Sequence, residues 1–178
     1  VSGAFYPADA DGLRRQVDGC LRRASRAPAL ATLAPHAGYS YSGPVAGVVY
    51  ASVAIPAEVV LVSFSHRGVG SPFAVWPDGA WETPLGNAPV ARDLCAEILR
   101  LRGFESDAGA FLREHSGEVQ LPFLQRLRPD LRIAPLSIQS HDPRALRDAG
   151  RALAVLLSGR DVLLAATTDL THCGEDYG

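Results

Sequence analysis

The chain has 178 residues, 47% of them hydrophobic, and its 17 basic and 19 acidic side chains give a formal net charge of −2. These values are typical of one soluble globular domain and exclude disordered, collagen-like and coiled-coil proteins, because the apolar fraction is high enough to fill a core. Every basic residue is an arginine and the arginines are interspersed with acids, so the sequence lacks the basic patch that nucleic-acid binding requires.

The first half of the chain alternates between helical patterns and short apolar runs. Apolar residues at helical spacing predict an amphipathic helix over Asp9–Ser25. A short strand is expected at Leu30–Leu33, and a capping serine followed by an early proline predicts a helix over Ser42–Val53. Val59–Phe64 is a continuous apolar run, as in strands that are buried on both faces.

The second half continues the same alternation. Strands are expected at Phe73–Trp76, Arg132–Gln139 and Asp161–Ala166. Helices are expected over Asn87–Arg102, Ser116–Leu127 with Pro122 in its first turn or at a kink, and Asp142–Leu157. Strands that alternate with helices are typical of βαβ units, so the predicted fold class is α/β with a mainly parallel central β-sheet flanked by helices.

No segment has the pattern of a membrane span or a secretion signal. Residues 27–57 carry no charge, but prolines and glycines interrupt them, so they contain no run of about 18 apolar residues. Residues 1–7 lack the basic and apolar regions of a signal peptide. Cys20, Cys95 and Cys173 form no CxxC pair, which argues against disulfides and structural zinc. We therefore expect a cytoplasmic protein with no membrane partner.

Four of the five histidines directly follow predicted strands, namely His36, His66, His141 and His172. The carboxyl ends of parallel strands lie at one edge of a sheet, where open α/β folds place their sites, so these side chains should converge. Two neutral imidazoles on adjacent strand ends are the beginning of a transition-metal site, and they can also act as acid–base groups without a metal. For His141 the neighbouring residues indicate ordinary helix capping.

Two further segments carry chemically useful side chains. Glu114 and His115 lie at a predicted helix start, where capping is one interpretation, and His115 also offers a proton-transfer group or an outer partner for a metal ligand. The segment after the last strand adds Asp169, His172 and Cys173 to the same edge. We interpret the Cys173 thiol as a small hydrophobe rather than a ligand.

Five motifs stand in order along the chain: Gly3-Ala4-Phe5-Tyr6-Pro7, Pro35-His36-Ala37-Gly38-Tyr39, Thr83-Pro84-Leu85-Gly86, Glu114–Phe123 and Asp169-Leu170-Thr171-His172. In this order they resemble the Memo-like family, whose prokaryotic members are named protein B of the AmmeMemoRadiSam system. The resemblance spans Gly3 to Gly174, and the ordered set is far more specific than any single piece. It implies a fold like that of the class III extradiol dioxygenases, a phosphorylase/hydrolase-like three-layer sandwich with a sheet between helices.

The resemblance also implies roles for individual residues. In the extradiol dioxygenases two histidines and a glutamate hold Fe(II), and another histidine acts as acid–base. Carried over by motif, His36 and His66 become ligands for copper or Fe(II), and His172 becomes the acid–base or outer histidine. Asp169 and His115 would line the same cavity as further catalytic candidates.

The chain departs from the family pattern at three places. Ser63-Phe64-Ser65-His66 replaces the usual Gly-Pro-Asn-His turn, and Cys173 replaces an aromatic residue. The third metal ligand of Memo-like proteins is a cysteine well downstream of the Asp-x-x-His motif, and it is not visible in this chain. We expect residues 1–178 to form a single Memo-like domain that lacks the C-terminal part of the family fold, which would expose apolar surface.

Three functions remain open. The first is a metal-binding Memo-like protein of the AmmeMemoRadiSam system, with partners in a radical-SAM pathway. The second is a metal-dependent oxidoreductase, a class III extradiol-type dioxygenase with Fe(II). The third is a phosphopeptide-binding module without catalysis, in which Arg67 meets a phosphate. In each case we expect a small-molecule or peptide ligand in the cavity at the strand ends.

Overall fold

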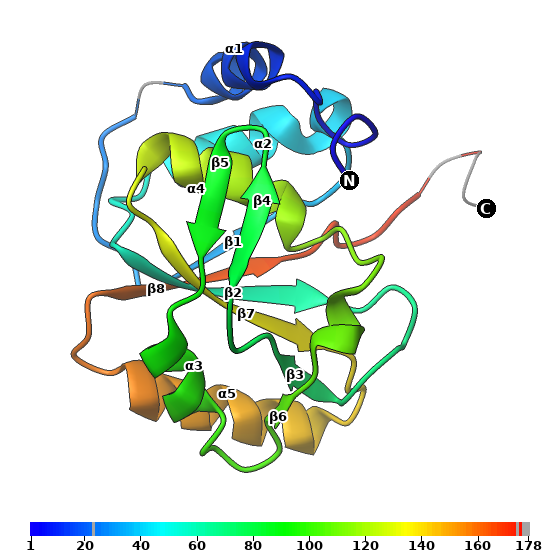
Figure 1. Ribbon diagram of the computed structural model, residues 1–178, viewed down its shortest axis with the longest axis vertical. Helices are drawn as coiled ribbons and strands as arrows, with labels where there is room; N and C mark the ends of the chain where they lie inside the picture. Colours follow the sequence, from blue (N-terminus) through cyan, green and yellow to red (C-terminus); the bar gives the residue numbers. More distant parts are fainter. Residues whose placement is uncertain (23, 174, 176–178) are drawn as a thin grey trace.

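A six-stranded β-sheet runs through the middle of the computed structural model, which describes residues 1–22, 24–173 and 175 (Figure 1). The strand order is β1-β8-β2-β7-β3-β6. The strands are β1 (Ala31–Ala34), β2 (Glu58–Phe64), β3 (Phe73–Val75), β6 (Glu105–Ser106), β7 (Arg132–Ile138) and β8 (Val162–Thr167). The first four strands in this order are mutually parallel, whereas β3 runs antiparallel to β7. The carboxyl ends of β1, β8, β2 and β7 therefore share one edge.

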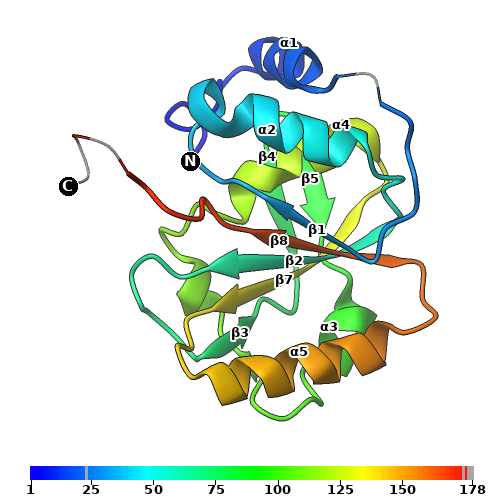
Figure 2. The ribbon, with the colours of Figure 1, turned by 180° about the vertical axis from the view of Figure 1, so that it is seen from behind.

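Helices cover both faces of this sheet (Figures 1 and 2). One face carries α1 (Ala10–Cys20), α2 (Tyr39–Ala51) and α4 (Leu121–Leu127), and the other carries α3 (Arg92–Ile98) and α5 (Pro143–Leu157). Two short 3-10 helices, η1 (Ala108–Phe111) and η2 (Glu118–Gln120), precede α4. The predicted α/β class with a mainly parallel sheet flanked by helices is confirmed. In the described part of the chain, every helix is too short or too polar to cross a membrane.

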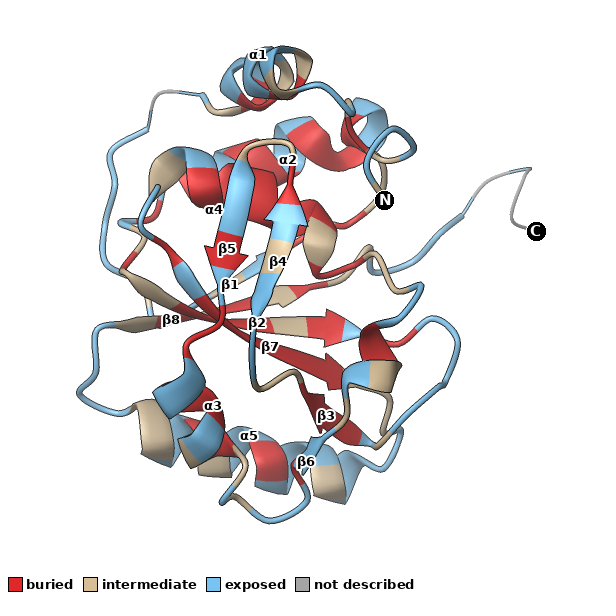
Figure 3. Ribbon diagram, viewed as in Figure 1, coloured by how far each residue is buried: buried red, intermediate tan, exposed pale blue. Residues whose placement is uncertain are grey.

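The central strands are buried on both faces because their side chains alternate between two cores. In β2, Val59 and Leu61 pack into the core beneath α1, α2 and α4, and Val60 packs into the core beneath α3 and α5. All three side chains are fully buried. Figure 3 shows the resulting buried band along β2 and β7. The continuous apolar run at Val59–Phe64 thus has the double burial that its sequence predicted.

Most predicted elements are present near their expected positions. The strands expected at Leu30–Leu33, Val59–Phe64, Arg132–Gln139 and Asp161–Ala166 are β1, β2, β7 and β8. The helix expected over Asp142–Leu157 is α5, and the Asp142 carboxylate caps it by accepting the main-chain N–H of Arg144. Pro122 lies in the first turn of α4, where its missing N–H costs no helical hydrogen bond.

The helix predicted over Asn87–Arg102 is wrong in its first part. Asn87 lies in a β-hairpin of β4 (Ala80–Thr83) and β5 (Gly86–Pro89), where it pairs with Glu82, and α3 begins only at Arg92. The tight turn requires the positive φ of 117° at Gly86, which glycine adopts without strain. The Thr83 hydroxyl also donates to Oε1 of Gln125 in α4, a contact between distant segments that local propensity cannot predict.

Two helix boundaries on the other face are also wrong. The helix predicted from Ser42 begins at Tyr39, and the Tyr39 N–H donates to the carbonyl oxygen of Phe5, so a distant main-chain group stabilises the helix start. The helix predicted over Asp9–Ser25 ends at Cys20. A Cβ added at Gly47 of α2 would lie 2.3 Å from the Cys20 carbonyl oxygen, so α2 closely approaches the end of α1. Position 23 of the predicted helix lies outside the described residues.

Candidate metal centre

Three histidines from separate segments meet at the carboxyl edge of the sheet. His36 lies just beyond β1, His66 lies just beyond β2, and His115 comes from the loop between η1 and η2. One ring nitrogen of each lies within 4.8 Å of the others. The ring centroids of His36 are 5.1 Å and 5.7 Å from those of His66 and His115, which stack on each other at 4.4 Å. We call these three side chains the histidine cluster.

Glu114 orients two members of the cluster. Its Oε2 accepts the main-chain N–H of His66 at 2.8 Å, and its Oε1 lies 3.0 Å from Nδ1 of the same residue. Oε1 also accepts the main-chain N–H groups of His115 and Ser116, each at 2.8 Å. Burial on its own raises the pKa of Glu114, but the hydrogen bonds from Ser116 and His66 outweigh it and lower the pKa to about 2.

The charge of Glu114 decides which nitrogen of His66 carries the proton. An ionised carboxylate accepts hydrogen bonds and cannot donate them, so Nδ1 of His66 is the donor in the contact with Glu114. The lone pair of a neutral His66 is then on Nε2. A carboxylate behind a metal-binding imidazole is the usual arrangement in protein metal sites, because it fixes the ring and raises the basicity of the other nitrogen.

His36 is almost fully buried, with 4% of its surface exposed. Its main-chain N–H donates to Oδ1 of Asp169 at 2.6 Å, and its Nδ1 lies 2.8 Å from the hydroxyl oxygen of Thr167. Burial lowers the pKa of His36, and nearby Asp169 opposes the shift without cancelling it. Burial and His66 also lower the pKa of His115. Both imidazoles are therefore neutral at pH 7, the form in which histidine binds metals.

An open cavity of about 690 Å³ lies beside the histidine cluster. Its apolar lining residues include Phe5, Tyr41 and Val45, and the Phe5 ring stacks on His115 with centroids 4.3 Å apart. Its polar lining residues include His66, His115, Asp169 and His172. A cavity lined by apolar side chains and a few convergent polar groups is the usual form of a small-molecule site.

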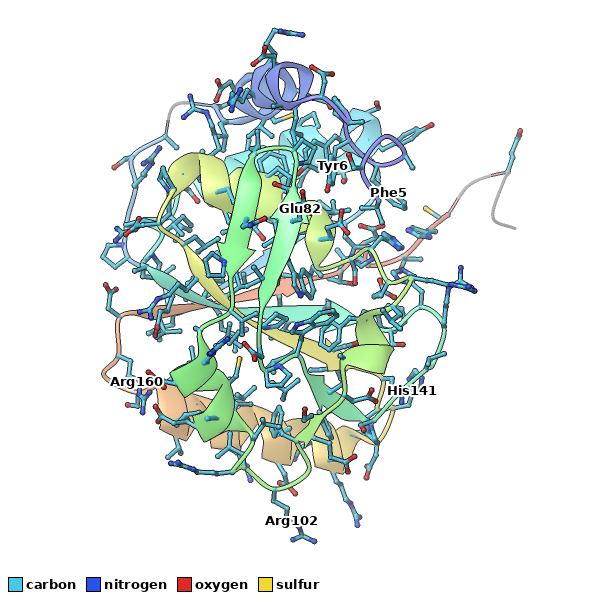
Figure 4. The ribbon with its side chains drawn as sticks, viewed as in Figure 1. Phe5, Tyr6, Glu82, Arg102, His141 and Arg160 are labelled. Atoms are coloured by element: carbon cyan, nitrogen blue, oxygen red, sulfur yellow. The ribbon has the colours of Figure 1, made fainter. Side chains whose placement is uncertain are left out.

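The structure places the remaining predicted residues at different distances from the cluster. Asp169 contacts His36 as described above, and Nε2 of the exposed His172 lies 3.3 Å from Oδ2 of Asp169. Cys173 is exposed rather than packed as a small hydrophobe. His141 is exposed near the start of α5, well separated in Figure 4 from Phe5, which marks the cavity. Among the predicted residues that the structure describes, only His115 therefore lies close enough to His36 and His66 to bind a metal ion together with them.

Sequence reasoning missed three residues that support the cluster, namely Phe5, Gln120 and Thr167. Phe5 stacks on His115, and the buried Gln120 amide and Thr167 hydroxyl lie behind His36. Phe5 and Gln120 belong to two of the five motifs that carry the family resemblance, and that membership was the available signal. Thr167 carries no such signal, because a threonine at the end of a strand is ordinary.

Comparisons with known proteins show which proteins this chain is similar to. The family model for "Memo-like protein" matches residues 1–178. The chain is 39% identical over 188 aligned positions to a MEMO1 family protein of Pyrobaculum arsenaticum, covering 97% of this chain and 67% of that protein. It is 38% identical over 190 positions to a MEMO1 family protein of Thermotoga neapolitana, covering 97% and 69%. The chain thus spans about two thirds of the length of these relatives.

A solved structure shows a related fold. The crystal structure of the uncharacterized protein JW3007 from Escherichia coli K12 matches with a TM-score of 0.54 and 21% sequence identity. The match covers 80% of this chain and 61% of that one. At this identity the likeness concerns the fold alone, since similar folds carry unrelated functions.

Proposed function

The chain belongs to the family of Memo-like proteins, and on that premise we propose that it binds one transition-metal ion through His36, His66 and His115. The observation that carries this proposal is the convergence of three imidazole nitrogens within 4.8 Å of one another. Three nitrogen donors suit copper and iron, so the donor set fits either metal. In this proposal His115 is the third ligand, whereas the sequence resemblance implied a downstream cysteine that is not visible in this chain.

The surrounding residues prepare these imidazoles for a cation. Glu114 provides a buried negative charge beside His66, and Asp169 provides another beside His36. Two carboxylates beside the histidine cluster contribute negative charge before a cation binds, which favours binding in a partly buried environment. Among the residues that the structure describes, no arginine lines the cavity.

We further propose that the cavity accepts a small molecule beside the metal. A bound copper or iron ion supplies Lewis-acid or redox chemistry. Phe5, Tyr41 and Val45 offer apolar contacts to the ligand, and Asp169 with His172 holds or moves a proton. This arrangement supports an oxidoreductase related to the extradiol dioxygenases as the second candidate function. The family membership supports a role in the AmmeMemoRadiSam system.

The metal proposal is tested on chelator-treated protein reloaded with Cu²⁺, or with Fe²⁺ under argon. Elemental analysis of the wild-type protein should give about one ion per chain, and the His36→Ala/His66→Ala double variant should hold none. His141→Ala is the matched control, because that histidine is exposed and outside the cluster. Circular dichroism checks that the double variant is folded. Undiminished metal uptake by the folded double variant would contradict the proposal.

The oxidoreductase candidate needs a separate experiment. Oxygen consumption is followed with the iron-loaded protein and a panel of catechols, with the His172→Ala variant beside the wild type. Consumption that depends on both iron and His172 supports this candidate. A protein that holds iron stoichiometrically and consumes no oxygen with any catechol contradicts it and leaves the metal-binding function intact.

A further inference from the structure

A buried chain of hydrogen bonds leads from α2 to the back of His36. The Tyr50 hydroxyl donates to Oε1 of Gln120 at 2.9 Å, and Nε2 of Gln120 donates to the Thr167 hydroxyl oxygen at 3.0 Å. The same oxygen lies 2.8 Å from Nδ1 of His36. All four residues are less than 10% exposed, and Tyr50 and Gln120 are completely buried. The chain joins α2, η2 and β8, and none of its four residues is among the residues that line the cavity.

The partners of Gln120 fix the orientation of its amide. Nε2 lies 3.0 Å from the carbonyl oxygen of Pro35 and 3.3 Å from that of Ser116. Carbonyl oxygens accept hydrogen bonds and never donate, so the NH₂ group must occupy this side of the amide. The NH₂ group has two protons, and its two nearer acceptors are the Pro35 carbonyl oxygen and the Thr167 hydroxyl oxygen, each at 3.0 Å, so Gln120 is a donor towards Thr167.

The direction of the remaining bonds then follows from counting protons. The Thr167 hydroxyl has one proton, which it donates to the carbonyl oxygen of Ala34 at 2.9 Å. Its oxygen already accepts from Gln120 and has one further lone pair. With that proton on the Ala34 carbonyl oxygen, Nδ1 of His36 is the donor in the third contact, and the lone pair of the neutral ring lies on Nε2.

Asp169 opposes this arrangement. Its Oδ2 lies 3.8 Å from Nε2 of His36, where its negative charge favours a proton on Nε2. A proton there would occupy the nitrogen that faces Asp169 and would leave the lone pair on Nδ1, directed towards Thr167. The two neighbours of His36 thus favour opposite tautomers.

We propose that Thr167, held by Gln120 and Tyr50, is a positioning residue that keeps His36 in the Nδ1–H tautomer and so leaves Nε2 free to bind a metal. Asp169 alone would select the tautomer that cannot bind through Nε2. The consequence for metal binding rests on the proposed function, whereas the tautomer itself does not.

The test is an NMR measurement on metal-free, ¹⁵N-labelled protein at pH 8, where His36, with its lowered pKa, is neutral. Long-range proton–nitrogen spectra show directly which ring nitrogen of His36 carries hydrogen, and a His36→Gln variant identifies the signal. The wild type and Thr167→Ser, which keeps the hydroxyl, should show the proton on Nδ1. Thr167→Val, which removes the hydroxyl at nearly constant shape, should move the proton to Nε2.

Metal affinity is then measured on the same proteins. Thr167→Val should bind copper about 10–100-fold more weakly than the wild type, the usual effect of losing a partner behind a metal ligand, and Thr167→Ser should restore binding. A wild-type His36 with its proton on Nε2 overturns the proposal without any variant, as does a folded Thr167→Val that keeps it on Nδ1. A tautomer change in a protein that binds no metal supports the positioning role and contradicts the proposed function.

Discussion

Glu114 holds His66 at two points, because its carboxylate accepts the main-chain N–H at 2.8 Å and lies 3.0 Å from Nδ1 of the same residue. The side chain of Glu114 is only 5% exposed, so these contacts are shielded from water. One carboxylate therefore fixes both the backbone and the ring of a proposed metal ligand.

We expect Glu114→Gln to destabilise the metal-free protein by about 3 kcal/mol at pH 7, because an uncharged amide replaces an acceptor of four N–H groups. The pKa of Glu114 is about 2 in the folded protein and about 4.3 in an unfolded chain. Its contribution is thus fully present above about pH 5 and is lost as the pH falls towards 2. Urea unfolding at several pH values measures both effects.

The control for this prediction is the pH dependence itself. The stability difference between wild type and Glu114→Gln should shrink between about pH 5 and pH 3. A difference that stays constant over this range would show that the variant acts through packing and that the charge of Glu114 contributes nothing.

The packing of α2 on α1 gives a second prediction. In Gly47→Ala the new Cβ would lie 2.3 Å from the Cys20 carbonyl oxygen, a main-chain atom that cannot move aside. We expect a loss of about 1–3 kcal/mol in the free energy of unfolding. Gly150→Ala in α5 is the matched control, since nothing lies within 4 Å of its Cβ and alanine favours a helix by about 1 kcal/mol. Equal urea midpoints for the two variants would contradict this description of the helix contact.

Two of the cavity histidines, His115 and His172, should behave differently towards metal. His115→Ala removes a member of the cluster and should lower copper affinity by at least the roughly 10–100-fold that loss of an outer partner costs. His172→Ala changes an exposed ring outside the cluster, so its copper affinity should stay close to that of the wild type. Competition titrations with a chelator measure both values. The reverse order would make His172 the third ligand and His115 an outer residue.

The ring of Phe5 should contribute to the orientation of His115. Phe5→Ala removes a stacked contact at 4.3 Å, which is worth about 0.5–1.5 kcal/mol, so copper affinity should fall by roughly 2- to 10-fold. Tyr41→Ala is the control, since Tyr41 lines the same cavity but is 86% exposed and does not stack on His115. If both variants lower copper affinity equally, the effect comes from the cavity wall in general.

The local sequence pattern was sufficient to predict those helices and strands whose start and burial are encoded in their own residues. β2 was predictable because a continuous run of β-branched and apolar residues suits a strand buried on both faces. α5 was predictable because Asp142 and Pro143 form a self-contained start signal. The β4–β5 hairpin was not predictable from Asn87, because its position depends on the contact of Thr83 with Gln125 in α4.

The same distinction applies to the candidate site. His36 and His66 could be expected to approach each other, since both follow strands of one parallel sheet. His115 could not be placed in this way, because it lies in an irregular loop whose path is set by Glu114 and by the packing of Gly117 against Trp81. A resemblance in sequence brought its motif to attention but not its position within the cluster.

The sequence by itself determined the class of fold, the edge of the sheet where chemistry can occur and two of the three histidines, since these follow from periodicity and strand direction. Only the tertiary structure brought His115 beside them and placed the Thr167 hydroxyl against Nδ1 of His36. The reason is that His36 and Thr167 are 131 positions apart in the chain, and a hydrogen bond acquires its direction only when all its partners are in place.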